Sequence, residues 1–233
     1  MKFLIEGEPL RTRSTDAGET LFGQNPPPWL PPRGNWHTRR FAWWFLRING
    51  WDIRGLYPDS GKFIIIGAPH SSNYDWFWGM FVQWALGVRF SFMIKSVFFF
   101  PPIGSFMRWL GGLPVDRRRA KGVINKAVEC FSDENKMILL ITPEGRTKPV
   151  RTLKRGFYEI AKIAQVPVLV VSFRYDERVI ALDGYIDLSD GFKAVAERLK
   201  AHYGTIKGRH RGYLDNRDMW AVRPLKEDVK TYE

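Results

Sequence analysis

The sequence predicts an α/β fold, in which a central sheet that is mainly parallel or mixed is flanked by helices. Short apolar runs rich in Ile, Leu and Val alternate along the chain with segments whose apolar residues recur at helical spacing. Such runs are typical of strands buried on both faces, and the alternation is typical of parallel sheets. The strongest strand candidates are residues 62–68, 137–142 and 166–173, and weaker ones are 89–94 and 178–182.

Helical spacing of apolar residues predicts six helices. In the first of them, Phe41, Trp44 and Phe45 follow i, i+3, i+4 spacing, three arginines are interspersed, and Gly50 is a plausible end. This aromatic helix either buries its face in the domain or enters the headgroup layer of a membrane. The expected helices are residues 36–50, 75–86, 103–112, 120–134, 154–165 and 191–204.

Proline divides the N-terminal part of the chain from the rest. The stretch "NPPPWLPPRGN" holds five prolines, so it cannot form a helix interior or a central strand. We therefore expect residues 1–35 to be an irregular, extended and solvated N-terminal extension. Residues 36–233 are expected to form a single domain, which is within the usual size of one hydrophobic core.

Composition narrows the class of partner. The chain carries 36 Lys and Arg against 24 Asp and Glu, a net charge of +12, which favours nucleic acid, a phospholipid surface or a phosphorylated substrate. Ten tryptophans among 15% aromatic residues lean towards a membrane interface, although a basic soluble enzyme with an aromatic core fits as well. No RNP-like aromatic strand and no zinc-ligand spacing is present, so we expect neither nucleic-acid binding nor a metal.

The sequence shows neither the pattern of a signal peptide nor that of a membrane-spanning helix. The N-terminal residues contain early acids and no sustained apolar core, unlike a signal peptide. No apolar run reaches the roughly 18 residues of a membrane-spanning helix. With a single cysteine, Cys130, no intrachain disulfide can form. We expect a cytoplasmic protein that lies peripherally on the inner face of the cell membrane.

Polar residues that follow the strand candidate at 62–68 suggest chemistry. The loop "GAPHSSNYDW" places His70 five positions before Asp75, at the start of the next expected helix. A carboxylate bound to one ring nitrogen of a histidine fixes the tautomer and leaves the other nitrogen as a base. The alternative is that Asp75 is a helix cap and His70 is incidental.

Two further charged loops follow apolar segments. Asp116 and Arg117–Arg119 follow a Gly-Gly turn, and Glu144, Gly145 and Arg146 follow the strand candidate at 137–142. In α/β sheets such loops converge on one crevice, and arginine matches the geometry of phosphate oxygens. The pattern indicates a base that acts near a phosphate, whereas solvated helix starts and ion pairs are the simpler structural alternatives.

Four blocks in order resemble the glycerolipid acyltransferases typified by 1-acyl-sn-glycerol-3-phosphate acyltransferase. The resemblance runs from about Lys62 to Phe173. The blocks are the His-x-x-x-x-Asp pattern of His70 and Asp75, "KSVFFFPPIGSFMRWLGGLPVDR", "TPEGRT" and "LKRGFYEIAKIAQVPVLVVSF". This sequence departs from the family pattern in the reversed order of Arg146-Thr147, in Ser96 where a Glu follows the lysine, and in the missing second proline of the last block.

The resemblance implies a glycerolipid-acyltransferase-like domain that moves an acyl chain from a coenzyme A or acyl-carrier-protein thioester to a lysophospholipid hydroxyl. His70 would be the general base, Asp75 would orient it, and no covalent acyl-enzyme, metal or cofactor would be needed. The leading acceptor is 1-acyl-sn-glycerol-3-phosphate; the alternatives are another lyso-lipid, an aminolipid or a glycolipid, and, from another class, a non-catalytic basic membrane-binding module.

The same resemblance implies roles for other residues. The aromatic segment between Trp76 and Trp109 would wall an acyl-chain tunnel, or simply pack as a helix pair. Lys95 would stabilise charge near the thioester or its carrier. The residues expected to bind or shape the acceptor and its phosphate are Arg117, Glu144, Gly145 and Arg146.

Overall fold

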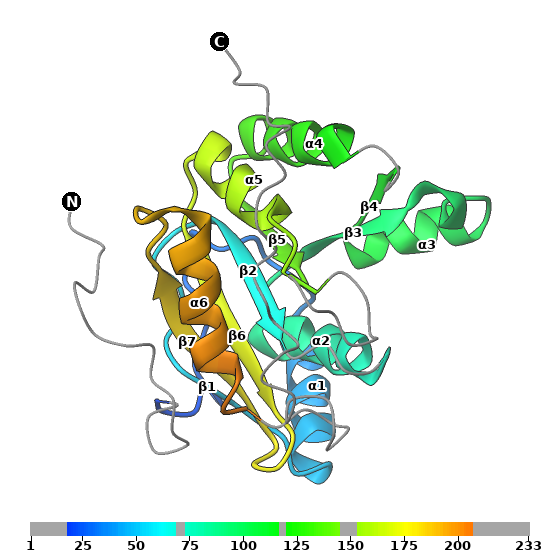
Figure 1. Ribbon diagram of the computed structural model, residues 1–233. Helices are drawn as coiled ribbons and strands as arrows, with labels where there is room; N and C mark the ends of the chain where they lie inside the picture. The colour runs from blue at the N-terminus through cyan, green and yellow to red at the C-terminus, as the bar shows by residue number, and fades with distance from the viewer. Residues whose placement is uncertain (1–17, 69–72, 117–119, 145–152, 207–233) are drawn as a thin grey trace.

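A computed structural model describes residues 18–68, 73–116, 120–144 and 153–206 (Figure 1). Within them lies one sheet with the strand order β1-β7-β6-β2-β5-β3-β4. The strands are β1 (Asp52–Arg54), β2 (Lys62–Ala68), β3 (Ser91–Lys95), β4 (Gly112–Val115), β5 (Met137–Ile141), β6 (Val168–Arg174) and β7 (Val179–Ile186).

The sheet is mostly parallel. Ile65 in the middle of β2 lies opposite Leu140 of β5 and Leu169 of β6, and both ladders are parallel. β3 extends this parallel set to β4, whereas β7 runs antiparallel to β6 and pairs with β1 in parallel. The predicted fold class is confirmed, and each predicted strand is present. β1 and β4, which the pattern did not predict, lie at the two edges of the sheet and are only a few residues long.

Helices cover both faces of the sheet (Figure 1). Alternate residues of β2 enter different cores: Ile64 and Ile66 pack with the side of α4, α5 and α6, whereas Phe63 and Ile65 pack with α1 and α2. The helices are α1 (Trp36–Ile48), α2 (Asn73–Leu86), α3 (Ile103–Leu110), α4 (Ala120–Asp133), α5 (Gly156–Ala164) and α6 (Gly191–Tyr203), with a 3₁₀ turn η2 (Ser96–Phe98). No helix in the described part of the chain is both long enough and apolar enough to cross a bilayer.

α3 lies beside the outer strands β3 and β4, away from the centre of the sheet (Figure 1). It ends at Gly111, whose φ of +104° places it in the region that favours glycine. A Cβ there would lie 2.2 Å from the carbonyl oxygen of Phe90, so no other residue fits this approach of α3 to β3. The close approach explains why a glycine turn, predicted from the sequence, follows α3, and β4 begins directly after Gly111.

α1 begins with a capping box, in which Asn35 accepts from the backbone of Thr38 and Thr38 accepts from the backbone of Asn35. Its buried face is formed by Ala42, Trp43 and Leu46. The predicted aromatic stripe therefore lies on a different side: Trp44 is 56% exposed, and only Phe45 of that stripe packs inward, stacking on Phe81 of α2 at 4.1 Å between ring centroids.

The segment 18–35 is not solvated throughout, contrary to expectation. Leu21 and Leu30 are buried in the core on the α1 and α2 side. The Leu21 amide donates to Ile53 O at 2.9 Å, and the Arg33 amide donates to Gly87 O at 2.9 Å. Prolines exclude a helix or a central strand from this segment, but they do not prevent its leucines from packing on the core. The boundary at residue 35 stays a prediction.

Candidate active site

Because β2, β3, β4, β5 and β6 run in the same direction, their carboxyl ends lie together at one end of the sheet, here called the carboxyl edge. Glu144 follows β5, Lys95 ends β3, Asp116 follows β4, Asp75 lies in α2 after β2, and Tyr175 directly follows β6. Four of the predicted site residues fall outside the described part of the chain: His70, Arg117, Gly145 and Arg146.

Asp75 is the most informative of these residues. It lies in the first turn of α2, where the partial positive charge of the helix N-terminus favours a carboxylate. It is only 6% exposed, and its Oδ1 accepts a hydrogen bond from the hydroxyl of Tyr175, 100 residues further along the chain. The buried carboxylate therefore joins the first turn of α2 to the end of β6 through a hydrogen bond that compensates for its removal from water.

Glu144 is buried beside the same edge, rather than lying in a solvated loop. Behind it, the buried Tyr203 of α6 donates its hydroxyl to Ile66 O (2.9 Å) and Val171 O (3.0 Å). Burial, reinforced by the charges of Asp183 and Glu144, raises the pKa of Tyr203 well above its usual value, so it stays a donor. This contact ties α6 to the strand ends that precede the His70 loop.

Lys95 and Asp116 lie on the same edge but in a different setting. Both side chains are exposed. β5 lies between β3 and β2, so Lys95 is two strand spacings, roughly 10 Å, from β2. The edge therefore brings four described residues of the predicted site to one side of the molecule, with the buried Asp75 and Glu144 at its centre and Lys95 and Asp116 towards its end.

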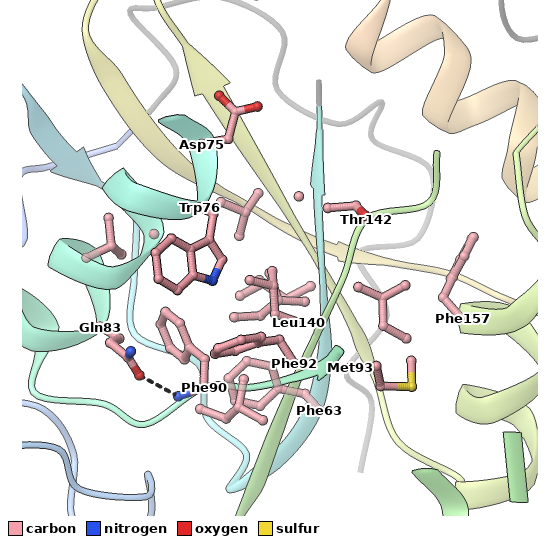
Figure 2. A pocket seen from close by; sticks show the side chains of 18 of the residues that line it. Phe63, Asp75, Trp76, Gln83, Phe90, Phe92, Met93, Leu140, Thr142 and Phe157 are labelled. Atoms are coloured by element: carbon pink, nitrogen blue, oxygen red, sulfur yellow. Dashed lines mark hydrogen bonds between the residues drawn. The ribbon is translucent and has the colours of Figure 1, made fainter. Parts of the chain in front are cut away.

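A cavity of about 1010 Å³ adjoins Asp75. Its walls are mostly apolar, and Figure 2 shows Asp75 at one end of it, with the carboxylate directed away from the apolar side chains. Trp76, Phe92 and Phe63 lie below Asp75 in this view. Gln83, which is fully buried in this wall, accepts from the Phe90 amide at 3.3 Å. The volume is at the upper end of the roughly 300–1,000 Å³ of small-molecule sites.

A family model described as "Acyltransferase" matches residues 53–174, just over half of the 233 residues. The chain belongs to the acyltransferase family. The matched residues run from β1 to the last residue of β6, so they include the strand ends around Asp75 and the sequence blocks on which the resemblance was based. The predicted family and enzyme class are confirmed.

The fold of this acyltransferase is similar to that of a solved structure, the 1-acyl-sn-glycerophosphate (LPA) acyltransferase PlsC from Thermotoga maritima. The two chains are 20% identical, the match covers 74% of this chain and 80% of the other, and the TM-score is 0.51. This likeness confirms the architecture. No match was found among curated protein sequences.

The cavity of the acyltransferase is lined from both faces of the sheet. Phe63 and Ile65 belong to the core beneath α1 and α2, whereas Ile124 and Phe157 belong to the opposite core. Between these sides, β3 and β5 pair through only two residue positions, Ser91–Leu139 and Phe92–Leu140. Beyond this short ladder β3 and β5 do not pair with each other, and near their carboxyl ends Ile94 and Ile141 line the cavity.

The aromatic segment between Trp76 and Trp109 includes Trp78, Phe81 and Trp84, which pack on the core on the α1 and α2 side, and two further groups. Trp76, Phe90, Phe92 and Phe98 line the cavity. A second group faces solvent without lining it, and consists of Phe77, Phe100, Phe106 and Trp109. The segment therefore contributes to the wall of a cavity, as expected of a tunnel, and also to an exposed surface that the spacing did not predict.

Proposed function

We propose that this acyltransferase moves a fatty acyl chain from an acyl thioester to the hydroxyl of a lysophospholipid. The thioester is carried by coenzyme A or acyl-carrier protein, and the leading acceptor is 1-acyl-sn-glycerol-3-phosphate, which would give phosphatidic acid. The observation that carries the proposal is the buried carboxylate of Asp75 at one end of a large apolar cavity, in a chain of this family. Such a cavity suits a long acyl chain, and the PlsC named above is described as an LPA acyltransferase.

His70 acts as the general base in this proposal. It takes the proton of the acceptor hydroxyl as the oxygen attacks the thioester carbonyl. The ester C–O bond forms, the C–S bond breaks, and the departing thiolate recovers the proton from the imidazolium. Asp75 holds the imidazole in the required tautomer and stabilises its charged form.

No covalent acyl-enzyme is required by this mechanism. Ser71 and Ser72 then have no nucleophilic role. Cys130 lies on α4, and burial raises the pKa of its thiol, which opposes formation of the nucleophilic thiolate. The acyl group passes directly from the thioester to the acceptor oxygen.

The acceptor phosphate is proposed to bind where the loops after β4 and β5 meet the carboxyl edge. Arg117 and Arg146 supply guanidinium donors to its oxygens. Glu144 and Gly145 shape the acceptor loop, and the buried position of Glu144 supports such a structural part. Lys95, the exposed last residue of β3, is proposed to stabilise charge near the thioester or its carrier, at the outer part of the edge.

A membrane surface is the proposed docking partner, on the cytoplasmic side. The supporting feature is a set of exposed aromatic side chains on α1, η2 and α3, here called the aromatic surface: Trp36, Phe41, Trp44, Phe98, Phe106 and Trp109. An exposed guanidinium accompanies it, since Arg40 lies 4.7 Å from the Trp36 ring. Aromatic rings beside cations suit the headgroup layer of anionic lipids.

The test is an acyl-transfer assay with purified protein, radiolabelled acyl-coenzyme A or acyl-carrier-protein donors, and lyso-lipids with and without phosphate. We expect transfer to lysophosphatidate, and a loss of at least roughly a hundredfold in His70→Ala, because general-base catalysis contributes about 10²–10⁴-fold. Wild-type turnover in His70→Ala sinks the general-base role. Transfer only to acceptors without phosphate discards the arginine roles and retains the His–Asp chemistry.

A further inference from the structure

Tyr175 binds the carboxylate of Asp75, although nothing in the family resemblance pointed to it. The residue directly follows β6, the immediate neighbour of β2 in the sheet. Its hydroxyl donates to Oδ1 of Asp75 in a bond that is partly buried. A hydrogen bond to a buried carboxyl group matters more than one at the surface, because the acceptor has lost most of its contact with water.

The ring of Tyr175 is itself held in place. Trp51 packs edge-on against it, with ring centroids 5.1 Å apart. Trp51 is buried and also contacts Trp78 of α2 at 5.2 Å. Asp75 and Trp78 are one helical turn apart on α2, so the same helix contacts Tyr175 directly and through Trp51. The hydroxyl therefore has a fixed position relative to the first turn of α2.

We propose that Tyr175 is a positioning residue for the acyl-transfer reaction, whose hydroxyl fixes the Asp75 carboxylate so that it can orient the imidazole of His70. This inference rests on the proposed function. A carboxylate that is held at Oδ1 cannot rotate freely about its Cβ–Cγ bond, so its other oxygen keeps one direction. The carboxylate then selects one tautomer of the imidazole before the acceptor arrives, and no reorientation is needed as the proton moves.

The same hydrogen bond also withdraws charge from the carboxylate. Without the hydroxyl, Asp75 would share its negative charge with fewer donors and would stabilise the imidazolium more strongly. The base would then remain protonated up to a higher pH. Loss of the hydroxyl is therefore expected to lower turnover and to move the acidic limb of the pH profile to higher pH.

The experiment compares Tyr175→Phe with the wild type in the acyl-transfer assay between pH 5 and 9. We expect kcat to fall roughly tenfold, which corresponds to loss of one charge-assisted hydrogen bond, with both KM values nearly unchanged. The matched control is Tyr185→Phe, which removes another tyrosine–carboxylate bond, from Tyr185 to Asp59 at 3.2 Å. Tyr185 lies opposite Leu169 near the start of β6, away from the carboxyl edge, so this variant is expected to keep wild-type kcat and pH profile.

A double-mutant cycle separates positioning from general stability. In the Asp75→Asn background, Tyr175→Phe is expected to change kcat less than twofold, since the carboxylate that it holds is gone. Equal losses in both backgrounds, or a wild-type kcat and pH profile in Tyr175→Phe, overturn the inference. If His70→Ala and Asp75→Asn both keep full activity, the proposed function is wrong. If both variants lose activity but Tyr175→Phe keeps it, only the inference about Tyr175 is wrong.

Discussion

The carboxyl edge of the sheet and the aromatic surface break the usual rule of burial in opposite ways. At the edge, the ionisable groups of Asp75, Glu144 and Tyr203 are removed from water. On the aromatic surface, large apolar side chains such as Trp44 and Trp109 are exposed to it. Both arrangements cost free energy in an isolated domain, the first through desolvation and the second through exposed apolar area.

The difference between the two regions lies in where the compensation comes from. At the edge it is internal, since Tyr175 donates to Asp75 and Tyr203 donates to backbone carbonyls. On the aromatic surface some compensation comes from arginine, but Trp44 remains more than half exposed within the chain. A buried, hydrogen-bonded carboxylate is consistent with the proposed active site, and exposed aromatic side chains are consistent with the proposed docking surface. The two regions should therefore fail separately when they are altered.

The largest effect is expected at the edge. Asp75→Asn removes the charge of the carboxylate and keeps its size, so the imidazole of His70 would lose its preferred tautomer and kcat is expected to fall roughly a hundredfold or more. Binding to anionic vesicles should not change. The measurement pairs steady-state kinetics with a vesicle sedimentation assay, and a parallel loss of vesicle binding would mean that the edge and the surface are not separate.

The strands that the sequence predicted correctly are those with a clear local pattern of apolar residues. The runs at 62–68, 137–142 and 166–173 predict β2, β5 and β6 because strands buried on both faces are continuously apolar. β4 was missed because its four residues include Pro114 and follow a glycine turn, and an edge strand tolerates both. The expectation that Leu21 and Leu30 are solvated was wrong, because the prolines around them exclude regular structure but not burial.

The residues of the candidate site differ in how far the sequence pointed to them. Asp75 follows a buried strand within a short motif, and it was the resemblance of four ordered blocks to a known family that gave it a role. Tyr175 gives no such signal, since it lies 100 residues away and meets Asp75 only because β6 pairs with β2. A polar aromatic residue directly after a buried parallel strand is a weak local sign, and strand order, which depends on long-range pairing, is needed to interpret it.

A smaller effect is expected at the aromatic surface. Trp44→Glu replaces an exposed apolar ring with an anion. Partition of the protein onto anionic vesicles should fall roughly tenfold or more, because burying such an apolar side chain is worth about 1.5–3 kcal/mol. Turnover of a water-soluble short-chain donor and acceptor should stay at the wild-type value.

Trp109→Glu on α3 tests whether the aromatic surface used for docking extends beyond α1. Normal vesicle binding by both variants would mean that the aromatic surface has no part in membrane docking.

The smallest and most specific effect is expected inside the cavity, which is lined by Asp75 of the edge and Phe98 of the aromatic surface. Gly79 on α2 lines it, and a Cβ there would meet nothing within 4 Å. Gly79→Leu should therefore occupy cavity space without straining the helix, where leucine is also the better helix former. We expect the kcat/KM ratio of long to short acyl donors to fall severalfold, up to roughly tenfold for two displaced methylenes.

Gly156 at the start of α5 is the matched comparison for Gly79. It lines the same cavity from the other face of the sheet, and a Cβ there also meets nothing within 4 Å. If the donor chain lies along α2, Gly156→Leu leaves the chain-length preference unchanged. A change in Gly156→Leu alone would place the donor chain on the α5 side, where Phe157 and Ile160 form the wall. Unchanged preference in both variants would mean that the cavity does not hold the donor chain.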